Sequence, residues 1–193
     1  MLRYLFIILP LCGIVLLSQG AYIHTKALLA QFLLKEAWAE TTLGKKEVRP
    51  WPWADTWPVS RLTVPRLGIS RIVLAGTSGS SLAFGPGHFF DSSLPGQPGN
   101  IIIAGHRDTH FKFLQSLVLD DIITLEDAAG IHHYYQVSDI QVVHEDDYSS
   151  VYSGEEHSLT LITCYPFDAV NPGGPLRYVI AADSIKPNQP VFI

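Results

Sequence analysis

The 193-residue chain has little of several things that mark common functional classes. It holds two cysteines and one methionine, and charged residues make up only 16% of it. Cys12 lies in an apolar run and Cys164 far downstream, so the sequence predicts no disulfide framework. It also has no internal repeat, no phosphate-binding P-loop and no dinucleotide fingerprint, which argues against solenoid and nucleotide-binding folds.

Charge is scarce and unevenly spread. The net charge is −5, and residues 1–57 carry six of the 13 Lys and Arg but four of the 18 Asp and Glu, which leaves seven and fourteen for residues 58–193. An acidic second part argues against nucleic-acid binding, which needs a basic surface. The histidines lack the spacing of metal ligands, so we expect no metal site, and no segment indicates a cofactor.

The amino-terminal segment is the one long apolar run. Residues 4–17 are apolar throughout and residues 21–23 extend the run, which together approach the roughly 20 residues that a membrane-spanning helix needs. Arg3 precedes the run, which favours an amino terminus in the cytoplasm and export of the rest. The sequence therefore predicts a transmembrane anchor over residues 1–23. A cleaved signal peptide is the alternative.

Residues 24–57 have a mixed character. An apolar helical pattern continues through Trp38, and we expect a helical stalk that lies on the membrane surface or docks on the following domain. Residues 44–58 then hold three tryptophans among several prolines, which predicts an extended linker.

Residues 58–193 have the pattern of a β domain. Short strand-like segments alternate with turns rich in Gly and Pro, and long helical patterns are absent. This spacing predicts an all-β barrel or sandwich. The expected strands cover residues 62–67, 69–74, 101–104, 121–126, 134–137, 140–143, 158–164 and 176–180, with a turn-rich loop at 84–89.

Cys164 is the candidate nucleophile of this domain. The β-branched run from Ser158 stops at Pro166, so the cysteine lies at the carboxyl end of a strand beside a loop of Pro, Asn and Gly. A free thiol at a strand end can act as a nucleophile. A small buried hydrophobic residue is the alternative interpretation.

Two other strand ends carry complementary groups. The apolar strand before Gly105 ends there and places His106 at its exit, and Arg177 opens a strand after a Gly-Gly-Pro turn. A thiol, a titratable imidazole and a fixed cation for a developing oxyanion are the parts of a cysteine transpeptidase.

These segments resemble one family. Thr160 to Cys164 is similar to the Thr-Leu-x-Thr-Cys motif of sortases, Gly105 to Phe111 resembles their histidine segment, and Arg177 follows the cysteine by thirteen positions, where the family carries its arginine. The resemblance covers residues 58–193. With its amino-terminal anchor, the chain looks most like the sortases of Gram-negative bacteria (class GN, the marine proteobacterial type).

The resemblance implies a fold, a reaction and partners. We expect an eight-stranded sortase-type β-barrel that cleaves a Leu-Pro-x-Thr-Gly-like motif, after Thr, in an exported protein with a carboxyl-terminal sorting signal. Cys164 would carry the thioester, Arg177 would stabilise the oxyanion, and His106 would exchange protons with the leaving and incoming amines. Thr163 would position the substrate carbonyl or serve only as a strand residue. The expected location is the inner membrane, single-pass, with the catalytic domain in the periplasm.

Alternatives remain open at this point. A periplasmic cysteine hydrolase or peptidase could use the same thiol, and a membrane-tethered β domain without enzymatic activity could use Cys164 for packing alone. For Asp108 we expect a cap on the short helix predicted after His106, and the alternative is an orienting contact to the imidazole.

Overall fold

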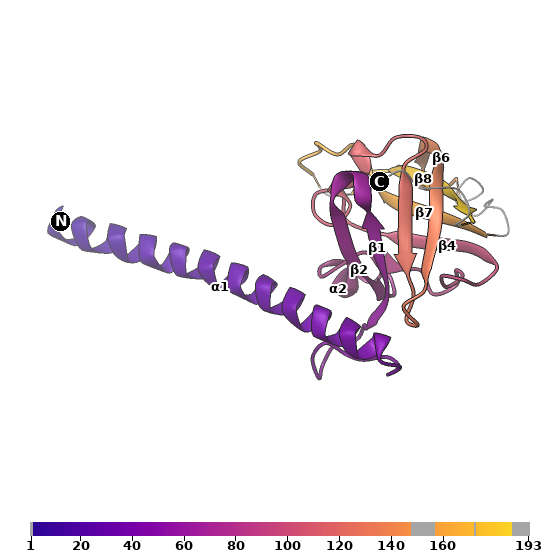
Figure 1. The fold of residues 1–193 in the computed structure, drawn as a ribbon. Coiled ribbons are helices and arrows are strands. Elements are labelled where there is room, and N and C mark those ends of the chain that lie inside the picture. The colour runs from indigo at the N-terminus through magenta and orange to yellow at the C-terminus, as the bar shows by residue number, and fades with distance from the viewer. Residues whose placement is uncertain (1, 148–156, 172, 187–193) are drawn as a thin grey trace.

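The chain folds into one long helix and one closed barrel (Figure 1). The computed structural model describes residues 2–147, 157–171 and 173–186, without the side chains of residues 2, 3, 5, 7 and 8. The last seven residues of the predicted 58–193 domain lie outside this range. The elements are α1 (Leu2–Thr42), β1 (Pro58–Val64), η1 (Pro65–Leu67), β2 (Ile69–Ala75), α2 (Gly79–Leu82), β3 (Gly87–His88), β4 (Gly99–Ala104), η2 (Lys112–Ser116), β5 (Ile122–Glu126), β6 (His132–His144), β7 (His157–Cys164) and β8 (Leu176–Ile185).

Eight strands close the barrel in the order β1-β2-β3-β4-β7-β8-β6-β5. The pairs β2–β3 and β4–β7 are parallel, and the other pairs with a recorded register are antiparallel. Burial alternates along β1, as expected for a strand with one face on a core. The predicted all-β, eight-stranded barrel is confirmed.

Three strand predictions were wrong. The strand expected at residues 62–67 ends at Val64, and Pro65–Leu67 form η1. Residues 134–137 and 140–143 belong to one strand, β6, whose register against β8 shifts between Val137 and Asp139. A bulge adds a residue and breaks the period-2 pattern, which explains why one strand resembled two. Within the expected loop at 84–89, Gly87 and His88 form β3, a two-residue strand that bridges β2 and β4.

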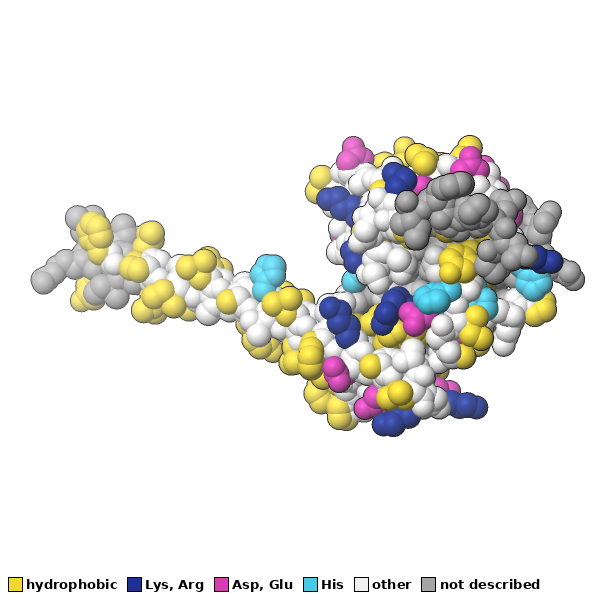
Figure 2. Space-filling view, viewed as in Figure 1, with side chains coloured by type: hydrophobic (Ala, Val, Ile, Leu, Met, Phe, Trp, Pro, Cys, Tyr) yellow, Lys and Arg dark blue, Asp and Glu magenta, His cyan; other side chains and the backbone are white. Residues whose placement is uncertain are grey.

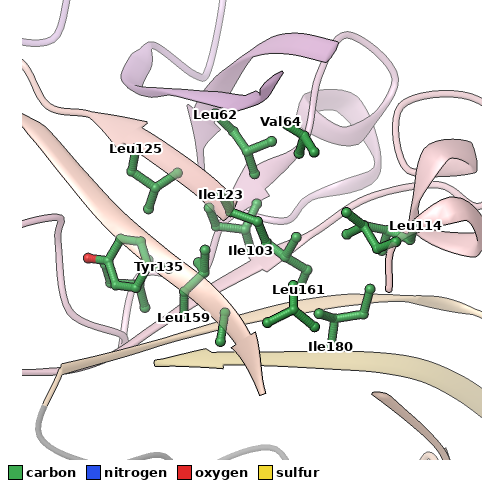
Figure 3. Close-up of a cluster of buried hydrophobic side chains, with 14 of the residues drawn as sticks. Leu62, Val64, Ile103, Leu114, Ile123, Leu125, Tyr135, Leu159, Leu161 and Ile180 are labelled. Carbon is green, nitrogen blue, oxygen red and sulfur yellow. The ribbon is translucent and has the colours of Figure 1, made fainter. Parts of the chain in front are cut away.

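The barrel interior is filled by branched aliphatic side chains (Figure 3). Six strands supply residues with no exposed surface, and η2 adds Leu114 from one side. Each such side chain contributes about 1.5–3 kcal/mol relative to an exposed one. The branched strand members of this cluster are Leu62, Val64, Val73, Ile103, Ile123, Leu125, Leu159, Leu161 and Ile180.

The carboxyl-terminal half of α1 docks on the outside of the barrel. Leu34 and Trp38 are each 1% exposed, and Ala37 is buried beside them. The guanidinium of Arg61 in β1 lies 5.6 Å from the centre of the Trp38 ring, a cation–π contact. Of the two arrangements expected for the stalk, the structure has the docked one.

The linker also packs on the domain. Trp51 meets the ring of Phe84 edge-on at 4.8 Å, and Gln31 of α1 donates a hydrogen bond to the Phe84 carbonyl at 2.8 Å. The Thr56 hydroxyl donates to the carbonyl of Ala75 at the end of β2. These contacts join the helix, the linker and the barrel.

The amino-terminal half of α1 projects away from the barrel, and apolar side chains cover much of it (Figures 1 and 2). Leu9, Leu11, Ile14, Leu16 and Leu17 are each more than 60% exposed. In the part of the chain that the structure describes, no helix meets the length and apolarity required to cross a membrane, so the expected anchor is not supported there.

Candidate active site

Strand register brings the three predicted side chains to one edge of the barrel. In the parallel pair β4–β7, Ala104 lies opposite Ile162. His106 comes two residues after Ala104, and Cys164 comes two residues after Ile162. In the antiparallel pair β7–β8, Cys164 lies directly opposite Arg177. Parallel neighbours end at the same edge of a sheet, so the imidazole strand and the thiol strand finish side by side, with the arginine strand next to them.

The ends of β4 and β7 are held together just behind the site. The Gly105 amide donates to the Ile162 carbonyl at 3.1 Å, and the Thr163 hydroxyl donates to the Gly105 carbonyl at 2.7 Å. Thr163 is 2% exposed. Its side chain is therefore buried and fixes the residue before His106, and the expected substrate contact of Thr163 stays a prediction.

A tight turn follows β4. A Cβ atom on Gly105 would lie 2.7 Å from the ring of Phe111, closer than packing allows, so this position requires glycine. The Phe111 amide donates to the His106 carbonyl at 3.0 Å, which closes the turn. His106 is exposed, whereas Arg107 is buried.

Cys164 is a free, half-buried thiol, as expected for a reactive group that a substrate can reach. The next residue, Tyr165, donates its amide to the Leu176 carbonyl at 3.0 Å, which extends the β7–β8 pairing past the cysteine. Backbone hydrogen bonds therefore fix the chain both before and after Cys164.

Arg177 has most of its donors committed. One terminal nitrogen, Nη1, donates to the carbonyls of Gly174 at 2.6 Å and Leu176 at 3.0 Å, and the other, Nη2, binds Glu145 at 2.5 Å. The side chain is 27% exposed. The guanidinium is thus fixed at the rim, where it can reach a ligand bound beside Cys164.

Aromatic rings pack next to these groups. Tyr165 stacks on Tyr178 with ring centres 6.1 Å apart, and Phe167 meets both rings edge-on. Burial raises the pKa of Tyr178 above its ordinary value, and the neighbouring Tyr165 adds to the shift. Phe167 and Tyr178 also pack against the core, so they anchor the strand ends that carry Cys164 and Arg177.

Other titratable groups near His106 have different surroundings. Burial lowers the pKa of His110, whose Nε2 lies 3.4 Å from the Ala83 carbonyl. The residue that caps η2 is Phe111, without a side-chain hydrogen bond, so the predicted capping role of Asp108 was wrong. Among the described residues, no group of three His, Cys, Asp or Glu is arranged to hold a metal ion.

Sequence reasoning missed two residues at this edge. Glu145 pairs with Arg177 and donates its amide to the Pro175 carbonyl. Arg107 was not singled out, although it follows His106 directly. No strand pattern marks its burial, because Arg107 lies in the turn after β4, which ends at Ala104.

Comparisons with known proteins agree with this geometry. The profile of the family described as "Sortase domain" matches residues 62–185. Sortase D of Bacillus subtilis (strain 168) is 34% identical over 120 residues, which cover 62% of this chain and 60% of that protein. The chain therefore spans less than two thirds of that relative.

Solved structures show the same fold. Sortase A from Corynebacterium diphtheriae superposes with a TM-score of 0.62 at 28% identity, covering 72% of this chain and 66% of that one. Sortase C-1 from Actinomyces oris superposes with a TM-score of 0.60 at 29% identity, covering 67% of this chain and 75% of that one. With a family profile that matches most of the barrel, and with three predicted side chains at one barrel edge, the chain belongs to the sortase family.

Proposed function

We propose that the chain is a cysteine transpeptidase that cleaves a sorting motif in an exported protein and transfers the acyl part to an amine. The observation that carries the proposal is the strand register, which puts His106, Cys164 and Arg177 at one barrel edge. Membership of the sortase family supports the same reaction class.

The first step is acylation. The Cys164 thiolate attacks the carbonyl carbon of the scissile peptide bond, and the resulting oxyanion is stabilised by donors of the Arg177 guanidinium. When the tetrahedral intermediate collapses, the carbon–nitrogen bond breaks. The leaving amine takes a proton from the His106 imidazolium, and the acyl group remains on sulfur as a thioester.

The second step is aminolysis. The nitrogen of an incoming amine attacks the thioester carbonyl and gives up a proton to the now neutral His106. Collapse of this intermediate forms the new amide and releases the Cys164 thiolate. The imidazolium and the thiolate are thereby restored, so the cycle consumes one peptide bond and forms one amide bond.

The finer assignments also belong to this proposal. The motif is Leu-Pro-x-Thr-Gly-like and is cut after Thr, and the substrate carries it in a carboxyl-terminal sorting signal. The subclass is the Gram-negative, class GN type. The motif and its cleavage site come from the resemblance of the sequence motifs, and the subclass comes from that resemblance together with the apolar run over residues 4–17.

We place the protein in the inner membrane, with the barrel in the periplasm. The support is the apolar run over residues 4–17 after Arg3, together with the exposed apolar side chains on the projecting half of α1. The test is extraction of membranes with alkaline carbonate, where an integral protein stays in the pellet. Release into the supernatant would contradict the assignment.

The activity is tested with the full-length protein in detergent, Leu-Pro-x-Thr-Gly-type peptides and an excess of a simple amine. Mass spectrometry should find the peptide cut after Thr and capped by the amine. Cys164→Ala should abolish both products, and His106→Gln and Arg177→Lys should lower the rate by at least about 100-fold, because each removes a group that acts in the transition state. Turnover that survives in Cys164→Ala would contradict the mechanism.

A further inference from the structure

Arg107 is a buried cation whose hydrogen bonds to the described residues all go to backbone carbonyls. It is 7% exposed, and Nη2 donates to the carbonyls of Ala169 at 3.0 Å and Asn171 at 2.6 Å, while Nη1 makes a longer contact of 3.4 Å to the carbonyl of Gly173. Among the described residues, no carboxylate lies within ion-pair distance of its guanidinium. A buried charge with this arrangement is costly unless its hydrogen bonds are all made.

All three acceptors belong to the connection between β7 and β8, which directly follows Cys164. The carbonyls alternate along the chain, and one guanidinium fork reaches all three because its donors spread in a plane. Arg107 itself directly follows His106. The contact therefore joins the segment that carries the imidazole to the segment that leaves the thiol.

The same connection also holds the third group of the site. The Gly174 carbonyl accepts a hydrogen bond from Nη1 of Arg177 at 2.6 Å, one residue after the last carbonyl that Arg107 contacts. Gly173 and Gly174 both have positive φ values, 83° and 103°. Because glycine has no Cβ atom, its backbone has few conformational restraints of its own. The position of the Gly174 carbonyl thus depends on contacts such as those from Arg107.

We propose that Arg107 is a positioning residue, which fixes the β7–β8 connection over the site and, through the Gly174 carbonyl, sets the position of Arg177. This proposal rests on the acyl-transfer function proposed above. It assigns Arg107 no contact with the reacting atoms. Substrate that binds beside Cys164 then meets a β7–β8 connection that is already ordered. Without the Arg107 hydrogen bonds, part of the binding free energy is lost to ordering this connection.

The test is Arg107→Lys, which keeps the charge but offers a compact ammonium in place of the planar fork. Hydrogen exchange in peptides that cover residues 165–175 should speed up by about tenfold or more, because opening of this segment becomes easier. Transfer activity should fall by about 10- to 100-fold in kcat/KM, with the larger part in KM. Arg107→Gln, which is neutral and keeps two donors, is the second variant if the lysine form does not fold.

Arg66→Lys is the matched control. Arg66 also makes three hydrogen bonds, two to Asp121 and one to the Ser116 carbonyl. It lies in η1 and makes no hydrogen bond or ion pair to the described residues of the β7–β8 connection. Its loss should lower thermal stability and leave both the exchange of residues 165–175 and KM unchanged.

The outcomes separate two failures. Wild-type protein without Cys164-dependent transfer would overturn the proposed function. The exchange data would still show whether the Arg107 hydrogen bonds order the β7–β8 connection. Active wild-type protein combined with unchanged exchange and unchanged KM in a folded Arg107 variant would overturn the positioning role. A rise of exchange that is uniform over the whole barrel, with no additional rise in residues 165–175, would do so as well.

Discussion

The barrel edge that carries Cys164 and the face on which α1 docks are built in opposite ways. At the edge, His106 is exposed, Arg177 is partly exposed, and polar groups are held by backbone carbonyls. At the docking face, Leu34 and Trp38 are almost fully buried. The edge keeps its polar groups accessible and therefore buries less apolar surface. The docking face stabilises the fold by burying apolar surface.

This difference predicts which mutations will alter activity and which will alter stability. Changes to exposed groups at the edge should alter activity with little effect on unfolding, and changes at the docking face should alter unfolding with little effect on activity. Residues just behind the edge, such as Thr163, should affect both. The following variants test this division.

The largest stability effect should come from Trp38→Ala. Removing a large buried side chain costs about 3–5 kcal/mol, and the cation–π contact to Arg61 is lost as well. Urea unfolding monitored by circular dichroism measures the loss, and transfer activity below the transition should be unchanged. Phe32→Ala, at a residue of the same helix that is 58% exposed, is the control. Equal effects of the two variants would contradict the docked helix.

Thr163→Val should affect both properties. The variant keeps the side-chain volume but leaves the buried Gly105 carbonyl without its hydrogen bond, which costs roughly 1–3 kcal/mol. Because Gly105 precedes His106, kcat should fall as well. Thr160→Val removes a partly buried hydrogen bond to Asn100 in the same strand pair but away from the site. It should lower stability alone, and a loss of activity equal to that of Thr163→Val would contradict the positioning role.

Away from both regions, Asp121 should make stability depend on pH. Burial acts to raise the pKa of Asp121, but hydrogen bonds from Arg66 and the Val118 amide outweigh it, so the folded pKa lies below the usual value. A depressed pKa means that the stabilisation is complete above the unfolded pKa, which is about 3.9, and is lost as pH falls through the folded pKa.

Asp121→Asn should therefore be less stable than wild type near neutral pH, and the gap should narrow towards pH 2. Urea unfolding at a series of pH values measures the gap, with the exposed Asp91→Asn as control. A gap that stays constant from pH 6 to pH 2 would show that the carboxylate charge contributes nothing.

The smallest effect should come from Glu145→Gln. The pair with Arg177 is exposed, with 46% of the Glu145 side chain accessible, and such pairs contribute about 0–1 kcal/mol. The glutamine oxygen can still accept from Arg177, so kcat/KM should fall by less than about fivefold. Asp146→Asn is the neighbouring control. A fall in kcat/KM above about tenfold would mean that the charge of Glu145 is required for the action of Arg177.

The motifs predicted the strand ends and the three residues they carry, because strand ends at glycine and proline are marked locally in the sequence. Other features depend on contacts between distant segments. The docking of Trp38 depends on β1, and the bulge in β6 hides its continuity. The carbonyls that Arg107 binds lie more than 60 residues away, so no local pattern marks them.

The central claim is that Cys164 forms an acyl-enzyme at the barrel edge. The direct measurement is the intact mass of the protein after brief mixing with a sorting-motif peptide in the absence of an amine, followed by peptide mapping. The account predicts a mass increase equal to the acyl fragment, located on Cys164, released by hydroxylamine and absent in Cys164→Ala. Cleavage of the peptide without any adduct on Cys164, or with the adduct on another residue, would contradict it.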